Sequence, residues 1–471
     1  MLSDLKKFRQ VLVLLRLKPF DETTAEGRSK ERYRRILLTT ITNFITRAAG
    51  SLLGLITVPL ALSYLGKEKY GLWAVITSMV AWTSLFDFGI MNSLVNVLSE
   101  ANGRGDKKAA RGYVSTAVLA MSVIALIAAC IVGVISPFIC WKAVLAVRFA
   151  ISEQTVMWSV LAAVICVLTG FPLSAVRQVY AGYQKAYVGN IFSLLGSIAT
   201  LTGLLAVVRL HGDLPWLILA FSGPGVMLSV INYFYITKKE MPWISPGLRY
   251  ASKQSLRRIS RTSIPLLLFQ VGALMVNETQ MITLAHVTNL RLVSEYSVVW
   301  RLGITLTSFV GLATSSFVPA FREANERGDT GWMESGFRRM LFLRMMIACI
   351  VMLVLVFAGN SLLHAWLHRS DFHYPTIFWV VQGIVLVSGV WATAHTDLMT
   401  IMDRIWIQVA MVLLNGVVTI VLTVLLAPRY GIIGAAISIG FVTVCLWTWM
   451  TPLMAKRFLV FRDSSPIAVN P

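Results

Sequence analysis

Four ionisable residues stand out because they lie inside long apolar segments of the sequence: Arg47, Asp87, Glu278 and Arg301. A charge inside a bilayer costs about 2.5–3.5 kcal/mol on insertion scales, so its presence indicates either a function or a paired charge. A guanidinium presents a planar fork of donors that matches phosphate oxygens. We therefore expect the arginines to bind an anionic group, such as a diphosphate, and the acids to release them or to carry a coupling ion.

Each arginine is expected to lie at a similar depth to one of the acids. Arg47 and Asp87 belong to consecutive antiparallel segments, and so do Glu278 and Arg301. The alternative interpretation is therefore two ion pairs, Arg47 with Asp87 and Arg301 with Glu278, in which the opposite charges only neutralise each other. The two interpretations are compatible, since a resting ion pair can open when a substrate arrives.

Amide side chains accompany these charges at helical spacing. Asn43 lies one turn before Arg47, and Gln270 and Asn277 lie two turns apart, next to Glu278. Such spacing gives each helix a polar face, either toward a shared cavity or in a seam of hydrogen bonds between helices. We predict no catalytic residue and no metal site. The predicted substrate-binding set is Arg47, Arg301, Asn43, Gln270 and Asn277, with Asp87 and Glu278 in ion coupling or charge pairing.

The composition excludes an ordinary soluble enzyme. Of 471 residues, 56% are hydrophobic and 14% are charged, too few to cover a soluble fold of this size with polar groups. The net charge of +20 is concentrated between apolar blocks, which is typical of loops beside anionic lipid rather than of a nucleic-acid partner. The five cysteines show no metal-ligand spacing. We expect a multi-pass membrane protein without a cofactor.

Apolar segments long enough to span a bilayer, about 20 residues, recur along the chain. Most of the 42 Lys and Arg fall in the tails and in the loops after even-numbered segments, so both termini are predicted to be cytoplasmic. The glycine–proline–glycine run at 223–225 is expected to interrupt the sixth segment. The twelve predicted segments are 36–64, 70–98, 114–139, 155–177, 188–208, 214–237, 262–287, 295–321, 339–363, 375–399, 408–427 and 431–455.

An internal repeat divides these segments into two halves. Residues 99–106 read SEANGRGD and residues 322–329 read REANERGD, at an offset of 223. Six spans per half is an even number, so both halves enter the membrane from the same face, as in transporters built from parallel repeats. The predicted parts are a basic cytoplasmic segment (1–35), an N-lobe (36–237), a cytoplasmic linker (238–261), a C-lobe (262–455) and a cytoplasmic tail (456–471). The basic segment 1–35 is predicted to form either an interfacial helix or a disordered tail.

Several short motifs resemble those of a known family. The runs YLG at 64–66, YGLW at 70–73, DFG at 87–89 and AGYQK at 181–185 resemble the Wzx-type flippases for O-antigen and exopolysaccharide. The resemblance covers roughly residues 33–455. It implies an all-α integral membrane protein of the MOP exporter superfamily, with about twelve transmembrane helices in two six-helix lobes that form a V around a central cavity.

The resemblance also implies a function and a location. A Wzx-type protein moves a polyprenyl-diphosphate-linked oligosaccharide from the inner to the outer leaflet of the bacterial cytoplasmic membrane by alternating access. Coupling to an H⁺ or Na⁺ gradient, contact with membrane lipids and cooperation with polysaccharide polymerase or export proteins would follow. A multidrug or small-solute exporter of the same fold is the alternative. A membrane polysaccharide polymerase or glycosyltransferase is disfavoured, because the predicted outer loops are too short for a catalytic domain.

Overall fold

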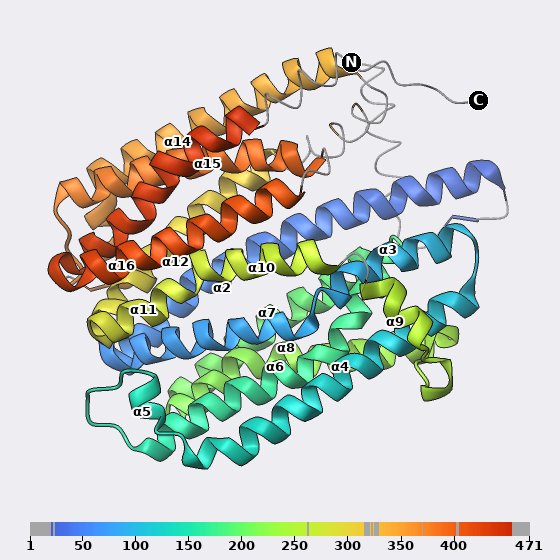
Figure 1. The fold of residues 1–471 in the computed structure, drawn as a ribbon, viewed down its shortest axis with the longest axis horizontal. Helices are drawn as coiled ribbons and strands as arrows, with labels where there is room; N and C mark the ends of the chain where they lie inside the picture. The colour runs from blue at the N-terminus through green and yellow to red at the C-terminus, as the bar shows by residue number, and fades with distance from the viewer. Residues whose placement is uncertain are drawn as a thin grey trace. The chain divides into compact units, whose positions relative to one another are not determined.

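The computed structural model describes residues 20–21, 24–260, 263–314, 321, 324, 329–369, 371–401 and 405–454. Within these ranges all regular structure is helical (Figure 1), which confirms the predicted all-α class. The residues that could form an interfacial helix at the start of the chain, and the C-terminal tail, lie outside the described ranges.

The chain divides into two compact units. Unit 1 consists of Met1–Leu53, Phe86–Ile139 and Met157–Ile264, and unit 2 consists of Gly54–Leu85, Cys140–Val156 and Pro265–Pro471. Helix α2 (Ala25–Ala81) therefore contributes its beginning to unit 1 and its remainder to unit 2. The division into an N-lobe (36–237) and a C-lobe (262–455) that the sequence predicts stays a prediction.

Unit 1 is a bundle in which the most extensive contact joins two neighbouring helices, α7 (Ala186–Arg209) and α8 (Leu214–Tyr235). Small residues let the two helices approach, since a Cβ on Gly196 would lie 3.8 Å from the Cα of Gly225. The expected interruption at 223–225 is wrong, because α8 continues through Pro224. The remaining helices of unit 1 are the first part of α2 (Ala25–Ala81), α3 (Ile90–Gly103), α4 (Lys107–Ile135), η2 (Ser136–Phe138), most of α6 (Glu153–Gly182), η3 (Ile236–Glu240), η4 (Pro242–Ile244), η5 (Leu248–Tyr250) and α9 (Lys253–Ser260).

Unit 2 contains the second part of α2 and most of the later helices. Glycines again provide close packing: Gly272 of α10 lies against Val412 of α16, and Gly416 of α16 lies against Met275 of α10. The other helical elements are most of η1 (Trp82–Asp87), α5 (Trp141–Val144), most of α10 (Ser263–Asn277), α11 (Thr279–Val287), α12 (Leu290–Thr314), α14 (Thr330–Leu367), α15 (Thr376–Ile401), α16 (Ile405–Phe441) and the π-helical turn η6 (Val442–Trp447).

The number of separate long helices is smaller than the predicted twelve spans. In the described ranges, eight helices are long and apolar enough to cross a membrane, or nine if a bent pair counts as one span. Two of them each merge two predicted segments. Helix α2 has 57 residues and contains Gly66 at φ 72°, and α16 contains Gly431 at φ 56°. Glycine adopts this left-handed conformation without a Cβ clash, so the backbone turns there.

Two predicted spans are not continuous helices. The segment 70–98 changes to the 3₁₀ helix η1 at Trp82 and resumes as α3 only after Gly89. The segment 262–287 breaks at Glu278, between α10 and α11. Because their apolar composition continues across the breaks, hydropathy alone did not reveal them. Irregular backbone at membrane depth is tolerated where it is buried in protein or lines a water-filled cavity.

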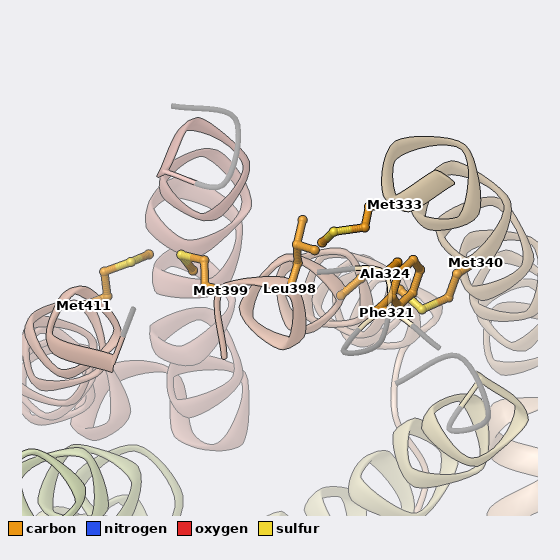
Figure 2. Close-up of a cluster of buried hydrophobic side chains, with 8 residues drawn as sticks. Phe321, Ala324, Met333, Met340, Leu398, Met399 and Met411 are labelled. Atoms are coloured by element: carbon orange, nitrogen blue, oxygen red, sulfur yellow. The ribbon is translucent and has the colours of Figure 1, made fainter. Parts of the chain in front are cut away.

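Buried side chains rich in methionine pack one region of unit 2. Figure 2 shows Met399 of α15 and Met411 of α16 facing each other, while Leu398 of α15 points toward the side chains near α14. Methionine is unbranched and fills irregular gaps between helices. The buried members of this cluster are Phe321, Ala324, Met333, Met340, Ala394, Leu398, Met399 and Met411.

The internal repeat is preserved in hydrogen bonds. Asp106 accepts a bond from the Ala109 amide at 2.8 Å and so caps α4, and Asp329 accepts one from the Trp332 amide at 2.9 Å and caps α14. The amide of each aspartate also donates to an alanine carbonyl five residues earlier, at 2.9 Å in both copies. The repeated motif therefore encodes one turn followed by a helix start.

We expect Asp106→Ala and Asp329→Ala each to lower the free energy of unfolding by about 1 kcal/mol, because each removes an N-cap acceptor. The measurement is thermal unfolding of the purified protein. Asp106→Asn and Asp329→Asn are the matched controls, since asparagine caps a helix equally well. Equal stability of the alanine and asparagine variants would show that the caps contribute nothing.

Candidate functional site

Arg47 and Asn43 lie on an exposed face of α2 in unit 1. The neighbouring face is used for packing: Thr42 accepts a hydrogen bond from the Asn190 amide at 3.0 Å, and Thr46 donates to the Asn190 carbonyl at 3.1 Å. Because Asn43 and Arg47 each follow one of these threonines, they are turned about 100° away from α7. Within the described residues, Arg47 forms no ion pair.

Asp87, the second charge predicted in unit 1, ends η1 and is half-buried. Its carboxylate accepts a hydrogen bond from the backbone amide of Gly89, the residue at which the chain turns into α3. In the described part of unit 1, the structure does not bring Asp87 into an ion pair with Arg47. Asp87 therefore supplies the hydrogen-bond acceptor for a backbone amide at the break between η1 and α3.

Gln270 and Asn277, the two predicted amides of unit 2, occupy the middle and the end of α10. Gln270 donates to the Ser84 hydroxyl at 2.9 Å, which joins α10 to η1. Asn277 is exposed, and its amide donates to the Ala273 carbonyl within its own helix at 2.7 Å. Gln270 therefore forms part of an interhelical seam, whereas the carbonyl end of Asn277 is available at the surface of the helix.

Glu278 and Arg301 are neighbours in unit 2. Glu278 is the residue between α10 and α11, and its carboxylate lies within the electrostatic reach of Arg301 and beside Ser78. Arg301 lies on α12, and a Cβ on Gly54 of α2 would be 3.6 Å from its Cδ. The described charged atoms of the two residues do not approach within the 4.0 Å of a salt bridge. The sequence thus placed these residues at a similar depth, but they form no closed ion pair.

A charged cluster that the sequence did not predict lies where α2 turns at Gly66. Lys67 bonds Glu295 of α12 at 3.0 Å and Asp371 at 3.1 Å, and Arg369 bonds Asp371 at 3.0 Å. We call Lys67, Glu295, Arg369 and Asp371 the hairpin cluster. It joins the turn of α2 to α12 and to the loop before α15.

The hairpin cluster is strongest when Asp371 is ionised. Burial acts to raise the pKa of Asp371, but hydrogen bonds from Lys67 and Arg369 outweigh it and hold that pKa below its usual range. Its contribution to stability is therefore present above the unfolded pKa, about 3.9, and is lost as the pH falls through the lower folded value.

Another ion pair that the sequence did not predict joins α14 to α15. Arg344 and Asp397 approach to 2.9 Å, with the arginine side chain 5% exposed and the carboxylate 46% exposed. Arg344 could have been singled out as an arginine inside a predicted span, but its partner could not. In the described ranges, no group of three His, Cys, Asp or Glu could hold a metal ion.

Comparison with known proteins identifies the family. The sequence profile of the family described as "Polysaccharide biosynthesis protein" matches residues 36–325, more than half of the chain. The chain belongs to this family. Among curated relatives, the membrane protein EpsK of Bacillus subtilis is 19% identical over 86% of this chain and 80% of its own length. A Yersinia pseudotuberculosis protein whose name refers to O-antigen export is 22% identical over 83% of this chain and 90% of its own length.

Solved structures show that the chain has the fold of MOP-superfamily transporters. An inward-facing multidrug resistance MATE transporter matches 90% of this chain and 99% of its own, with a TM-score of 0.74 and 13% identity. A MOP superfamily transporter from Pyrococcus furiosus matches 92% and 97%, with a TM-score of 0.66 and 13% identity. The expected all-α fold class of the MOP/MATE type is confirmed over 90% of the chain.

The Arg344–Asp397 pair predicts an asymmetry between two variants of this protein. Asp397→Leu leaves a buried guanidinium without this carboxylate and is expected to destabilise by about 2 kcal/mol, less than a fully buried pair because the carboxylate is half-exposed. Arg344→Met removes the buried charge, keeps an apolar side chain and leaves a carboxylate that solvent can reach. It is expected to cost less. Thermal stability of the two purified variants tests this, and a less stable Arg344→Met protein would contradict it.

Proposed function

We propose that this protein moves a polyprenyl-diphosphate-linked oligosaccharide from the inner to the outer leaflet of the bacterial cytoplasmic membrane. The family match and the name of the O-antigen relative support this substrate class. The motion we propose is alternating access, since the chain has the fold of MOP transporters. The lipid tail can remain in the bilayer throughout, so the protein has to shelter only the diphosphate and the sugars.

The observation that carries the proposal is the state of Arg47. This guanidinium lies in an apolar helix, is exposed and forms no ion pair among the described residues. A charge at membrane depth is costly, so an arginine left available for a ligand indicates an anionic partner. A diphosphate matches it, because phosphate oxygens accept two parallel hydrogen bonds from one guanidinium.

Arg301 is the second proposed phosphate ligand, with a different resting environment. It lies near Glu278 but forms no closed ion pair with it among the described residues. A diphosphate could therefore recruit Arg301 without first breaking a short salt bridge. Glu278 and Asp87 both lie at breaks between helices, and we propose that they respond to a coupling ion, H⁺ or Na⁺, at these breaks.

The amides have unequal roles in this proposal. Asn43 shares the exposed face of Arg47, and Asn277 is exposed at the end of α10, so both can bond sugar hydroxyls. Gln270 is already bonded to Ser84, so we propose that it joins the substrate only if that bond opens. The membrane orientation, with both termini cytoplasmic, and cooperation with a polysaccharide polymerase belong to the same proposal.

Arg47→Ala and Arg47→Lys are expected to reduce polysaccharide export about tenfold in cells that lack their own copy of the gene. Charge-assisted hydrogen bonds contribute about 1.5–3 kcal/mol, and about 1.4 kcal/mol is a factor of ten in rate. Lysine keeps the charge but loses the fork, so Arg47→Lys should not restore export. Surface polysaccharide is measured at equal amounts of protein in the membrane.

Arg209→Ala is the matched control, because Arg209 is an exposed arginine at the end of α7 rather than inside an apolar segment. It should export normally. Normal export by Arg47→Ala would contradict the proposed phosphate contact. Export of a cationic drug, with no change in surface polysaccharide on deletion, would favour the multidrug alternative.

A further inference from the structure

A cavity of about 480 Å³ lies within the helices of unit 2. It is lined by side chains of α10, α12, α14, α15, α16 and η6. Its volume falls within the range of about 300–1,000 Å³ that is usual for small-molecule sites. Arg47 belongs to unit 1, and of the proposed substrate and ion contacts in unit 2 Asn277 lines the cavity, whereas Gln270, Glu278 and Arg301 do not.

The lining of this cavity carries no ionisable side chain among the described residues. Most of the wall is apolar and includes buried Leu386, Val412 and Ile439. The lining therefore offers no cationic side chain to a diphosphate and no carboxylate to a cation. The cavity is therefore suited to a neutral occupant with a large apolar surface.

Three residues of the lining each carry a buried polar atom that lacks a hydrogen-bond partner in the described part of the chain: Asn415 Oδ1, Thr419 Oγ1 and Trp447 Nε1. Asn415 is 5% exposed and Thr419 is 0% exposed. The two lie one turn apart on α16, so they share the face that lines the cavity. Buried polar atoms are nearly always hydrogen-bonded, and an exception indicates a missing partner.

The three atoms together specify the chemistry of that partner. The amide oxygen of Asn415 only accepts, the indole of Trp447 only donates, and the hydroxyl of Thr419 does both. A ligand hydroxyl can donate to Asn415 and accept from Trp447 or Thr419. Trp447 and Thr443 reach the wall from η6, a π-helical turn, and such turns occur frequently at functional sites.

We propose that this cavity binds a neutral, largely apolar molecule through a hydroxyl group held by Asn415, Thr419 and Trp447. The three anchoring residues take no part in the proposed flippase contacts, although Asn277 also lines the cavity. A molecule of this chemistry can come from the membrane, as a long-chain alcohol lipid, or from solution, as a compact hydrophobic alcohol.

A photoreactive decanol that carries a diazirine tests the proposal on the purified full-length protein. After illumination, labelled peptides are quantified by mass spectrometry at increasing probe concentration. We expect saturable labelling of cavity residues such as Val412, and labelling of Val421, which is 50% exposed on the same helix, that rises without saturation. Cavity labelling that rises in parallel with Val421 would overturn the proposal.

Two variants test the polar anchor. Thr419→Val and Asn415→Leu should each raise the half-saturating concentration of the probe about fivefold, the effect of losing one hydrogen bond of ordinary strength. Thr448→Val is the matched control, since its hydroxyl bonds the Thr443 carbonyl at 2.8 Å and it does not line the cavity. An unchanged half-saturating concentration in both variants would mean that the cavity holds water or a non-specific occupant only.

Competition on the unmodified protein gives a readout that does not depend on the folding of any variant. Decanol should displace the probe at a concentration at least about fivefold lower than decane, which lacks the hydroxyl. Equal displacement by the two would overturn the proposed anchor. Stronger displacement by hexadecanol points to a membrane-derived alcohol, and stronger displacement by menthol points to one from solution; either result supports a hydroxyl-bearing ligand.

Discussion

The bilayer core offers no water to satisfy a broken helix or a charge, and most of the structure follows from this constraint. Several polar groups inside the apolar segments are accordingly satisfied by another part of the protein. Asp87 caps the amide of Gly89 at one helix break, and Glu278 lies at a second break beside Ser78. Arg344 is buried and paired with Asp397. Arg47, by contrast, is exposed and forms no ion pair among the described residues, which indicates a ligand.

The same constraint explains how α2 is held in unit 2. Its turn at Gly66 is fixed by Lys67, which bonds Glu295, 228 residues away, and the Asp371 carbonyl, 304 residues away. Along the same helix, the Leu55 carbonyl accepts a hydrogen bond from the Trp366 indole at 2.6 Å. These contacts explain why the second part of α2 belongs to the same compact unit as α12, α14 and α15.

Some features could be predicted because they depend on composition or on local pattern. The apolar segments predicted the all-α class. The repeated SEANGRGD and REANERGD runs marked equivalent positions in the two halves, and the structure shows matching caps there, made by Asp106 and Asp329. The helix breaks at Trp82 and Glu278 could not be predicted from hydropathy, because apolar residues continue across them. The pairing of Lys67 with Asp371 depends on tertiary folding over a long sequence separation, and a single sequence carries no signal for it.

The central claim is that a charged diphosphate, rather than a sugar or a lipid tail alone, is what the protein recognises. Reconstitution into liposomes tests it most directly, with a fluorescent polyprenyl-diphosphate oligosaccharide and a membrane-impermeant quencher added outside. The account predicts that label from the inner leaflet becomes quenchable when the protein is present, and that a neutral polyprenyl glycoside with the same sugars and tail stays protected. Equal movement of the neutral and diphosphate lipids, or movement of neither beyond that in protein-free liposomes, would contradict the account.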